Sequence, residues 1–249
     1  ETAGCGLIRP DGRGLKPQRN LRMKFYKTLA LIVLVGAFFA GSADAAQDQN
    51  ELVGKIRKTY ENLNAFKGEF KQVLSHRESG TNESRDGRLS FQKPLLIRWQ
   101  TARPHEETLV VTGKEIWDYL PDEEIVYRYP ASMAQDSRSI IQVITGQAAL
   151  TKDFKIKNLG NENGLVKMAL YPKEASPQMV EANIWVEPAT GYIKRAKIID
   201  FYGNANDVSF KTFEPAKKID AGQFRFTPPK GVEVEDRLDR KVEERELFK

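Results

Sequence analysis

The chain has 249 residues, of which 40% are hydrophobic, 29% charged and 10% aromatic, and its net charge is +5. This composition excludes a disordered chain, and the length allows a sizeable core in one domain or two small ones. The positive charge lies in residues 1–45, with seven Lys and Arg against three Asp and Glu, whereas residues 46–249 hold 32 basic and 31 acidic residues. Nucleic-acid binding requires a one-sided basic surface, so we expect no nucleic-acid partner for this nearly neutral body.

Residues 23–45 have the organisation of a secretory signal peptide. Lys24 and Lys27 precede an apolar run from Leu29 to Ala40, and the segment ends in Ala43-Asp44-Ala45. The run is shorter than the ~20 residues that a membrane-spanning helix needs, and the small residues at its end fit cleavage after Ala45. We therefore expect an exported chain whose mature form begins near residue 46.

Cys5 is the only cysteine of the chain and lies ahead of the apolar run. The mature chain is therefore expected to have no disulfide, no thiol nucleophile, no cysteine-based metal site and no thiol for a lipid anchor, and to be soluble after cleavage. Residues 1–22 begin without methionine, are rich in Arg and Gly, and show no apolar periodicity. We interpret them as upstream translation rather than as a structural element.

Hydrophobic periodicity predicts one amphipathic helix followed by many strands. From Asp48 to Leu63 the apolar residues follow helical spacing over about four turns. From Phe66 to Leu74 the period changes to two, which predicts a strand with one solvated face. Ten further segments have strand character and are separated by Gly or Pro turn signals: residues 88–92, 96–100, 108–111, 115–120, 125–129, 154–158, 165–171, 181–186, 193–201 and 208–213.

Residues 137–145 interrupt the strands with a short, very apolar helix that ends at Gly146. We expect this helix to be buried, because its isoleucines gain nothing from exposure to water. About eleven strands against two helices predict a mainly β (α+β) fold built on one large antiparallel sheet. Residues 46–235 are expected to form one domain followed by a charged tail, 236–249, and the stretch from Glu233 onward is expected to be a solvated helix or disordered.

The mature chain shows no arrangement that is typical of catalysis. His76 and His105 are its only histidines, both lie in polar loop segments, and no G-x-S-x-G elbow positions a serine. Gly113-Lys114 is followed by Glu115, which does not fit a P-loop. Acidic pairs such as Asp122-Glu123 fall in turns, where carboxylates are usually solvated. We therefore expect no enzyme activity, no metal site and no cofactor.

Aromatic residues recur at strand spacing and include Trp99, Trp117 and Trp185. Ordinary core packing accounts for any one of them. A curved sheet with only two helices can also leave its concave face incompletely filled, so that the inward side chains line an apolar cavity suited to a lipid. Both interpretations remain open from the sequence.

Five short motifs occur in an order and spacing that are informative together. The longest is Phe-Arg-Phe-Thr-Pro-Pro-Lys-Gly-Val-Glu-Val over residues 224–234. The others are Phe66-Lys67-Gly68-Glu69-Phe70-Lys71-Gln72 after the first helix, Gly87 with Leu89, Pro94 with Arg98-Trp99, and Gly113-Lys114 before Trp117. Over about residues 48–235 the chain thereby resembles the LolA family of periplasmic outer-membrane lipoprotein carriers.

This resemblance implies a half-open antiparallel β-barrel closed by helices, with an apolar interior that receives the acyl chains of a lipoprotein in the periplasm. It also implies an inner-membrane lipoprotein-releasing ABC transporter that loads the carrier and an outer-membrane lipoprotein receptor that unloads it. The family has an Arg just before the Pro of the third strand region, and this Arg bonds to the helical lid. Lys93 holds that position here; it keeps the charge but lacks the planar fork of donors.

The expected function is that of a monomeric periplasmic carrier that binds acylated lipoproteins released from the inner membrane and delivers them to the outer membrane. The alternative is a non-carrier periplasmic lipid-binding or lipid-sensing module on the same fold. Lys93 is the candidate lid latch. The candidate cavity-lining and lid residues are Phe70, Leu89, Phe91, Leu96, Ile97, Trp99, Trp117, Tyr119, Ile140, Ile141, Ile144 and Trp185.

Overall fold

The computed structural model describes residues 41–136 and 138–238. The expected upstream residues 1–22, the signal peptide up to residue 40 and the tail beyond Leu238 lie outside the described residues. The chain divides into two compact units, Glu1–Asp44 and Ala45–Lys249. Apart from the first four residues of the first helix, every element named below belongs to the second unit.

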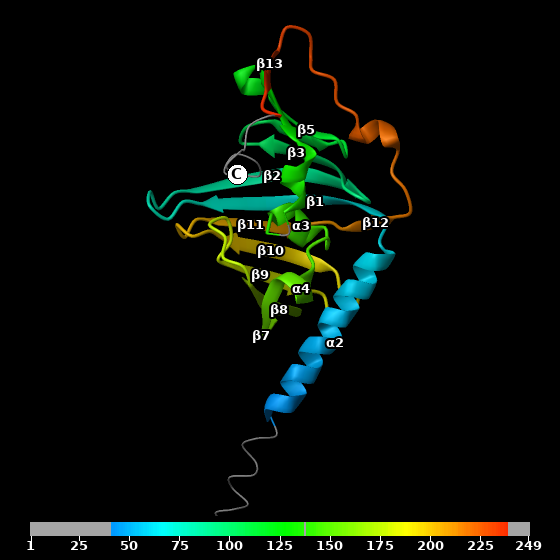
Figure 1. Ribbon diagram of the computed structural model, residues 1–249, viewed down its shortest axis with the longest axis vertical. Helices are drawn as coiled ribbons and strands as arrows, with labels where there is room; N and C mark the ends of the chain where they lie inside the picture. The colour runs from blue at the N-terminus through cyan, green and yellow to red at the C-terminus, as the bar shows by residue number, and fades with distance from the viewer. Residues whose placement is uncertain (1–40, 137, 239–249) are drawn as a thin grey trace, which may run out of the picture. The chain divides into compact units, whose positions relative to one another are not determined.

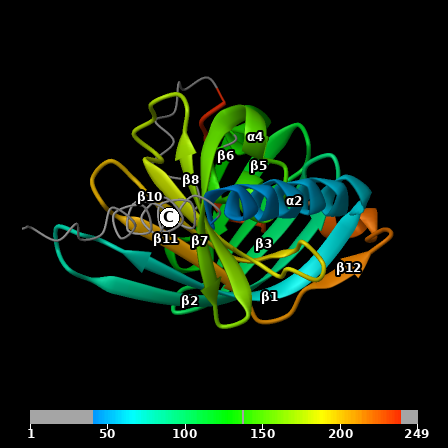
Figure 2. The same cartoon turned by 90° about the horizontal axis from the view of Figure 1, so that it is seen from below.

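Helix α2 spans Gly41–Asn62 and therefore begins before the predicted start at Asp48. Its predicted apolar stripe is confirmed, because Leu52, Val53, Ile56 and Tyr60 are buried in one cluster with the inward side chains of the sheet. Figure 2 shows α2 lying across the open side of the curved sheet. Within the described part of the chain, no helix combines the length and hydropathy that crossing a membrane requires.

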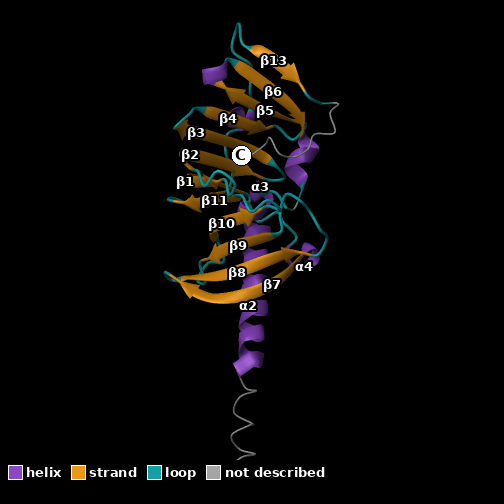
Figure 3. Cartoon of the chain, turned by 90° about the vertical axis from the view of Figure 1, so that its left-hand side faces the viewer, coloured by secondary structure: helices purple, strands orange, loops and turns teal. Residues whose placement is uncertain are grey.

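The body is one curved sheet whose order is β13-β6-β5-β4-β3-β2-β1-β11-β10-β9-β8-β7, with β12 paired to β1 (Figures 1 and 3). The two ends of this order do not pair, so the barrel is half open, as expected. The strands are β1 (Ala65–Ser75), β2 (Asn82–Gln92), β3 (Leu96–Arg103), β4 (Glu107–Val111), β5 (Glu115–Leu120), β6 (Ile125–Pro130), β7 (Phe154–Glu162), β8 (Leu165–Pro172), β9 (Glu181–Val186), β10 (Ile193–Ile199), β11 (Ala205–Phe210), β12 (Glu214–Ala216) and β13 (Glu233–Asp236).

Each of the eleven predicted strands is present, and two short strands were missed. β12 pairs with the start of β1, and β13 pairs with β6 in parallel, whereas the other pairings are antiparallel. The expectation of a solvated helix or disorder from Glu233 onward is wrong for Glu233–Asp236, because these residues form β13. The free edge of β6 provides their backbone hydrogen-bond partners, which local sequence periodicity does not reveal.

The sheet has one buried, concave face and one more polar, outer face. In β1, Phe66, Phe70 and Leu74 are buried while Lys67 and Glu69 are exposed, which confirms the predicted alternation. The inward residues of the other strands join them in one continuous apolar cluster with α2. On the outer face a smaller apolar cluster forms where the 3-10 helix η4 (Ala221–Phe224) packs over the start of β1.

One segment crosses the concave face from end to end. β6 and β7 are consecutive in the chain but lie near opposite ends of the sheet, so residues 131–153 must span the distance between them. This segment contains the 3-10 helix η3 (Ala131–Gln135) and the short helices α3 (Ile140–Ile144) and α4 (Leu150–Asp153). Figure 1 shows it running in front of the strands. The predicted apolar helix is thus α3, and its place in the crossing segment explains its hydrophobicity.

Candidate functional site

The concave face of β1, β2 and β3 is lined by closely packed rings and aliphatic side chains. Phe70 and Trp99 lie with ring centroids 4.3 Å apart, and Phe66 and Phe91 with centroids 5.5 Å apart. A side chain at Gly87 would collide with this layer, because a Cβ there would lie 2.5 Å from Cζ of Phe70. Of the predicted lining residues, the structure places five on this face: Phe70, Leu89, Phe91, Ile97 and Trp99, each at most 3% exposed.

Helix α3 fills the hollow of the sheet. All five of its residues are buried, and Ile140, Ile141 and Ile144 belong to the concave cluster. α2 and α3 lie over the concave face, and the predicted lining residues of that face are buried in one apolar cluster with them. Their role in lining a lipid-binding site stays a prediction.

The polar contacts of α3 are local to the crossing segment. Ser139 caps its N-terminus by accepting a hydrogen bond from the amide of Gln142 at 3.2 Å, and the Gln142 side chain donates to the carbonyl of Ala134 at 2.7 Å. Thr145 donates to the carbonyl of Ile141 at 2.7 Å. All of these partners lie within the crossing segment itself, close to α3 in the chain. Burial of its apolar side chains is thus what holds the helix on the sheet.

The end of α3 meets α2 at a position that only glycine fits. Gly146 has a φ of +66°, and a Cβ there would lie 2.1 Å from Cγ of Tyr60. The hydroxyl oxygen of Tyr60 accepts a hydrogen bond from the amide of Ile193 at 3.1 Å, and its burial strongly raises the pKa of the phenol. α2, α3 and β10 are therefore joined at the Tyr60 ring. Sequence reasoning placed Tyr60 on the buried stripe but did not predict this junction.

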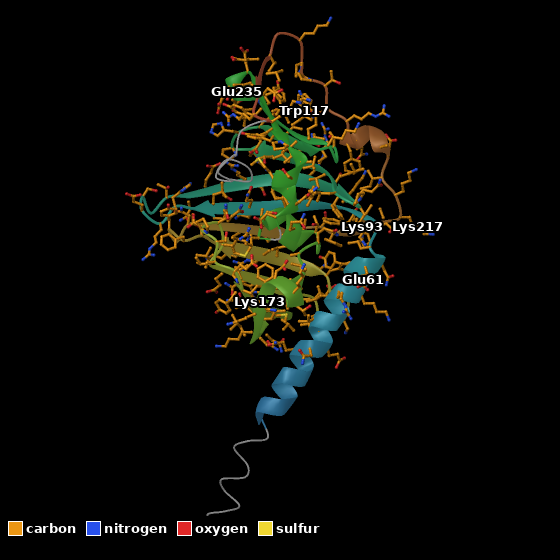
Figure 4. All side chains as sticks on the ribbon, viewed as in Figure 1. Glu61, Lys93, Trp117, Lys173, Lys217 and Glu235 are labelled. Atoms are coloured by element: carbon orange, nitrogen blue, oxygen red, sulfur yellow. The ribbon has the colours of Figure 1, made fainter. Side chains whose placement is uncertain are left out.

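Lys93 lies between β2 and β3 and reaches α2 rather than α3. Its Nζ donates to the carbonyl oxygens of Tyr60 at 2.6 Å and Glu61 at 2.8 Å. These carbonyls belong to the last turn of α2, where a positive charge is favourable because the helix dipole is negative there. Figure 4 shows Lys93 beside Glu61 at this end of the helix. The candidate latch thus holds the helix that covers the open side of the sheet.

Four predicted lining residues lie on the outer face. Leu96 packs against the small cluster under η4. Trp117 and Tyr119 lie next to Phe226, at ring-centroid distances of 5.8 and 6.0 Å. Trp185 is buried next to two cations, with Nζ of Lys167 4.9 Å and the guanidinium carbon of Arg195 4.1 Å from its ring centroid. Strand alternation turns all four away from α3, and their bulk alone did not show which face they occupy.

A groove of about 740 Å³ also lies on the outer face, between β1, β2, β3 and the segment that contains η4. Charged and polar side chains dominate its lining, including Lys67, Glu69, Arg88 and Arg98. Arg98 donates to the carbonyls of Gln223 and Arg225 and so ties this segment to the sheet. The polar lining makes the groove unsuitable for acyl chains.

The concave face has a polar end that sequence reasoning missed. Asp118 on β5 and Thr101 on β3 point inward and are 5% and 4% exposed. Asp118 Oδ1 and Thr101 Oγ1 are buried without hydrogen-bond partners. Nearby, Arg85 pairs with Glu107 at 3.2 Å. The alternation in Glu115–Leu120 alone did not reveal this end, because the large aromatic Trp117 and Tyr119 lie on the opposite face of the strand from Asp118.

Comparison with known proteins agrees with this architecture. Residues 61–227 match the family described as outer membrane lipoprotein carrier protein LolA. The chain is 28% identical over 210 residues to an outer-membrane lipoprotein carrier protein of Bordetella avium, covering 83% of this chain and 93% of the relative. It is 30% identical over 210 residues to the protein of that name from Vibrio parahaemolyticus, covering 84% and 95%.

Among solved structures, an uncharacterized conserved protein from Thermus thermophilus aligns with a TM-score of 0.50 at 15% identity, over 76% of this chain and 99% of that one. This similarity concerns the fold alone. The family match, by contrast, covers both the inward strands and the crossing segment with α3. The chain belongs to the LolA family of outer membrane lipoprotein carrier proteins.

Proposed function

We propose that this protein is a periplasmic carrier that takes up the acyl chains of lipoproteins released from the inner membrane and delivers them to the outer membrane. The observation that carries the proposal is the fully buried α3, a five-residue helix whose polar contacts are local and whose burial is apolar. Removal of α3 would expose an apolar concave face, which acyl chains would cover in its place. The proposal includes no catalytic step.

The free energy gained when acyl chains are buried is reduced by the free energy needed to displace α3 from the concave face. Burial of a methylene is worth about 0.8 kcal/mol, so three acyl chains with about 40 methylenes would lose roughly 30 kcal/mol in water. Such chains cannot cross an aqueous compartment unprotected. Because bound chains must displace α3 from the same face, part of this free energy is offset, and the cargo remains releasable.

The partners of the proposed cycle follow from the need to move this cargo in one direction. We expect an inner-membrane ABC transporter to supply the work of loading and an outer-membrane receptor to accept the lipoprotein. The similarity to proteins named outer-membrane lipoprotein carrier supports this setting. The protein would act as a monomer, because the open side of the sheet is covered by its own α2.

A release assay tests the proposal. Membrane vesicles that contain the transporter and retained lipoproteins would be incubated with ATP and the purified protein, residues 46–249. Soluble complexes of lipoprotein with this protein are expected only when transporter, ATP and protein are all present. If lipids bind but no lipoprotein leaves the membrane, the alternative of a non-carrier lipid-binding or lipid-sensing module is favoured instead.

A photoreactive acyl chain would locate the cargo in the released complex. Cross-links are expected at concave residues such as Phe70 and Trp99. The outer-face residues Trp117 and Trp185 are the matched controls, because they are also large aromatics but point away from α3. Cross-links at these two tryptophans in place of the concave residues would contradict the proposed binding face.

A further inference from the structure

A carboxyl group occupies an inward position in the otherwise apolar row of β5. Ile116 and Asp118 face the concave side, and Asp118 pairs across the sheet with Leu109 of β4 and Tyr127 of β6. Leu109 and Ile116 belong to the concave cluster. Asp118 is 5% exposed, and its Oδ1 has no hydrogen-bond partner. A polar atom buried without a partner is costly, so its position requires a reason.

A second unsatisfied polar atom lies on the same part of the face. Thr101 of β3 is opposite Glu107 of β4, whose next inward neighbour along the strand is Leu109, opposite Asp118. Thr101 Oγ1 is buried without a hydrogen-bond partner. Glu107 is paired with Arg85 of β2 at 3.2 Å and lies between the two unsatisfied groups. Asp118 and Thr101 thus each have a buried side-chain oxygen without a hydrogen-bond partner, on the same side of the apolar face.

The environment of Asp118 favours its neutral form. Burial is the main cause that raises the pKa of Asp118 to about 8; the negative charges of Glu107 and Glu123 add to it, and Arg237 and Arg85 oppose it. A protonated carboxyl offers one O–H donor and a carbonyl acceptor. The hydroxyl of Thr101 also offers both. Neutral groups of this kind suit an uncharged polar ligand rather than an ion.

We propose that Asp118 and Thr101 form a hydrogen-bonding subsite for the amide or ester linkage of an acylated ligand whose chains lie on the adjoining apolar face. This inference rests on the proposed carrier function. An acyl chain ends in a carbonyl, and that carbonyl must leave water together with the first methylenes when the chain is buried. The subsite gives it a donor and thereby makes burial of the linkage less unfavourable.

Two matched, uncharged probes test the subsite. One is the palmitoyl amide of an amino-terminated polyethylene glycol, and the other is the cetyl ether of the same polyethylene glycol, both used below the concentration of micelle formation. The wild-type protein is expected to bind the amide about tenfold more tightly than the ether. Asp118→Leu and Thr101→Val are each expected to lose most of this preference while the affinity for the ether is maintained.

Two variants control for folding and for chemistry. Asp118→Asn keeps a donor and an acceptor, so it should retain the preference for the amide. Tyr119→Leu changes the next residue of β5, which lies beside Phe226 on the outer face, and should leave both affinities unchanged. Equal binding of both probes by the wild type, or an undiminished preference in Asp118→Leu, overturns the subsite. Failure to bind either probe overturns the carrier function itself.

Discussion

Gly146 lies against the ring of Tyr60, so that a Cβ at residue 146 would be 2.1 Å from Cγ of that ring. This contact joins the end of α3 to the buried stripe of α2. In the closed arrangement, α3 occupies the concave face and α2 covers its open side. The Gly146–Tyr60 contact joins these two helices in that arrangement.

Gly146→Ala is expected to lower the free energy of unfolding by roughly 2–4 kcal/mol, because alanine adds a clash with Tyr60 to a left-handed backbone conformation. Gly160→Ala is the matched control: its φ of +90° is also left-handed, but no atom lies within 4 Å of the added Cβ. Denaturant unfolding of both variants separates the clash from the backbone strain. Equal losses in the two variants would show that the contact with Tyr60 has no effect.

Weakening the packing of α3 against the concave face should strengthen ligand binding if acyl chains replace this helix. Ile141→Ala removes buried apolar surface, so it should destabilise the closed arrangement and raise the apparent affinity for an acyl probe. Each 1.4 kcal/mol shifted in this equilibrium allows up to about a tenfold gain. Ile219→Ala is the control, because Ile219 is buried in the outer cluster. It should lower stability without raising affinity, and the same gain in both variants would argue against displacement of α3.

Loss of the ammonium of Lys93 should loosen the last turn of α2. Lys93→Met removes charge-assisted hydrogen bonds to the carbonyls of Tyr60 and Glu61, with an expected loss of about 1–2 kcal/mol. Lys93→Arg should keep most of the stability, since the guanidinium also donates to carbonyls. Amide hydrogen exchange at residues 60–63 would report the effect locally. Lys58→Met, at an exposed position of the same helix, should change little; an equally large effect there would contradict a specific role for Lys93.

The raised pKa of Asp118 should make the free energy of unfolding fall as pH rises. Its pKa is raised from 3.8 to about 8 in the folded state, mainly by burial, so the folded protein holds a proton that the unfolded chain releases. This contribution is complete below about pH 4 and is lost as pH rises toward about 8, at up to about 1.4 kcal/mol per pH unit. Asp118→Asn should flatten this slope in unfolding experiments across that range.

A carboxyl with the opposite shift provides the control for this pH dependence. The pKa of Asp86 is lowered, chiefly by its hydrogen bond from Lys211. Its contribution to stability is therefore present at neutral pH and lost as pH falls. Asp86→Asn should change the acid side of the stability curve and leave the slope between about pH 4 and 8 in place. If Asp118→Asn leaves that slope intact, Asp118 is not the group responsible.

Arg237 should influence both stability and the titration of Asp118. Its guanidinium carbon lies 3.8 Å from the ring centroid of Tyr127, and it donates to the hydroxyl of Tyr129 at 2.8 Å. Arg237→Met is expected to cost about 1–3 kcal/mol and to raise the pKa of Asp118 further, because a nearby positive charge is lost. The pH window of Asp118 should then shift upward. The exposed Lys230→Met should leave that window unchanged; an unshifted window in Arg237→Met would exclude the coupling.

Strand positions were predictable from the sequence, but the faces of some strands were not. In β1 the alternation of Phe66 and Phe70 with charged residues shows directly which side is buried. In β5, Trp117 and Tyr119 are large and apolar while Asp118 is charged, so local patterning predicts the wrong inward face. The pairing of Asp118 with Leu109, and of Ile116 with Tyr129, decides the orientation of β5. Periodicity fails there because a burial preference for each residue cannot override the register of the whole sheet.

The sequence by itself determined the mainly β class, the amphipathic helix, the short apolar helix and the family. Each of these depends on local spacing or on motifs that can be read within a few residues. Only the tertiary structure decided that α3 fills the concave face, that Lys93 holds α2, and that Asp118 is buried beside the apolar cluster. These facts depend on contacts between residues far apart in the chain. The path of residues 131–153 across the sheet places α3 on the concave face, and strand register turns Asp118 toward that face.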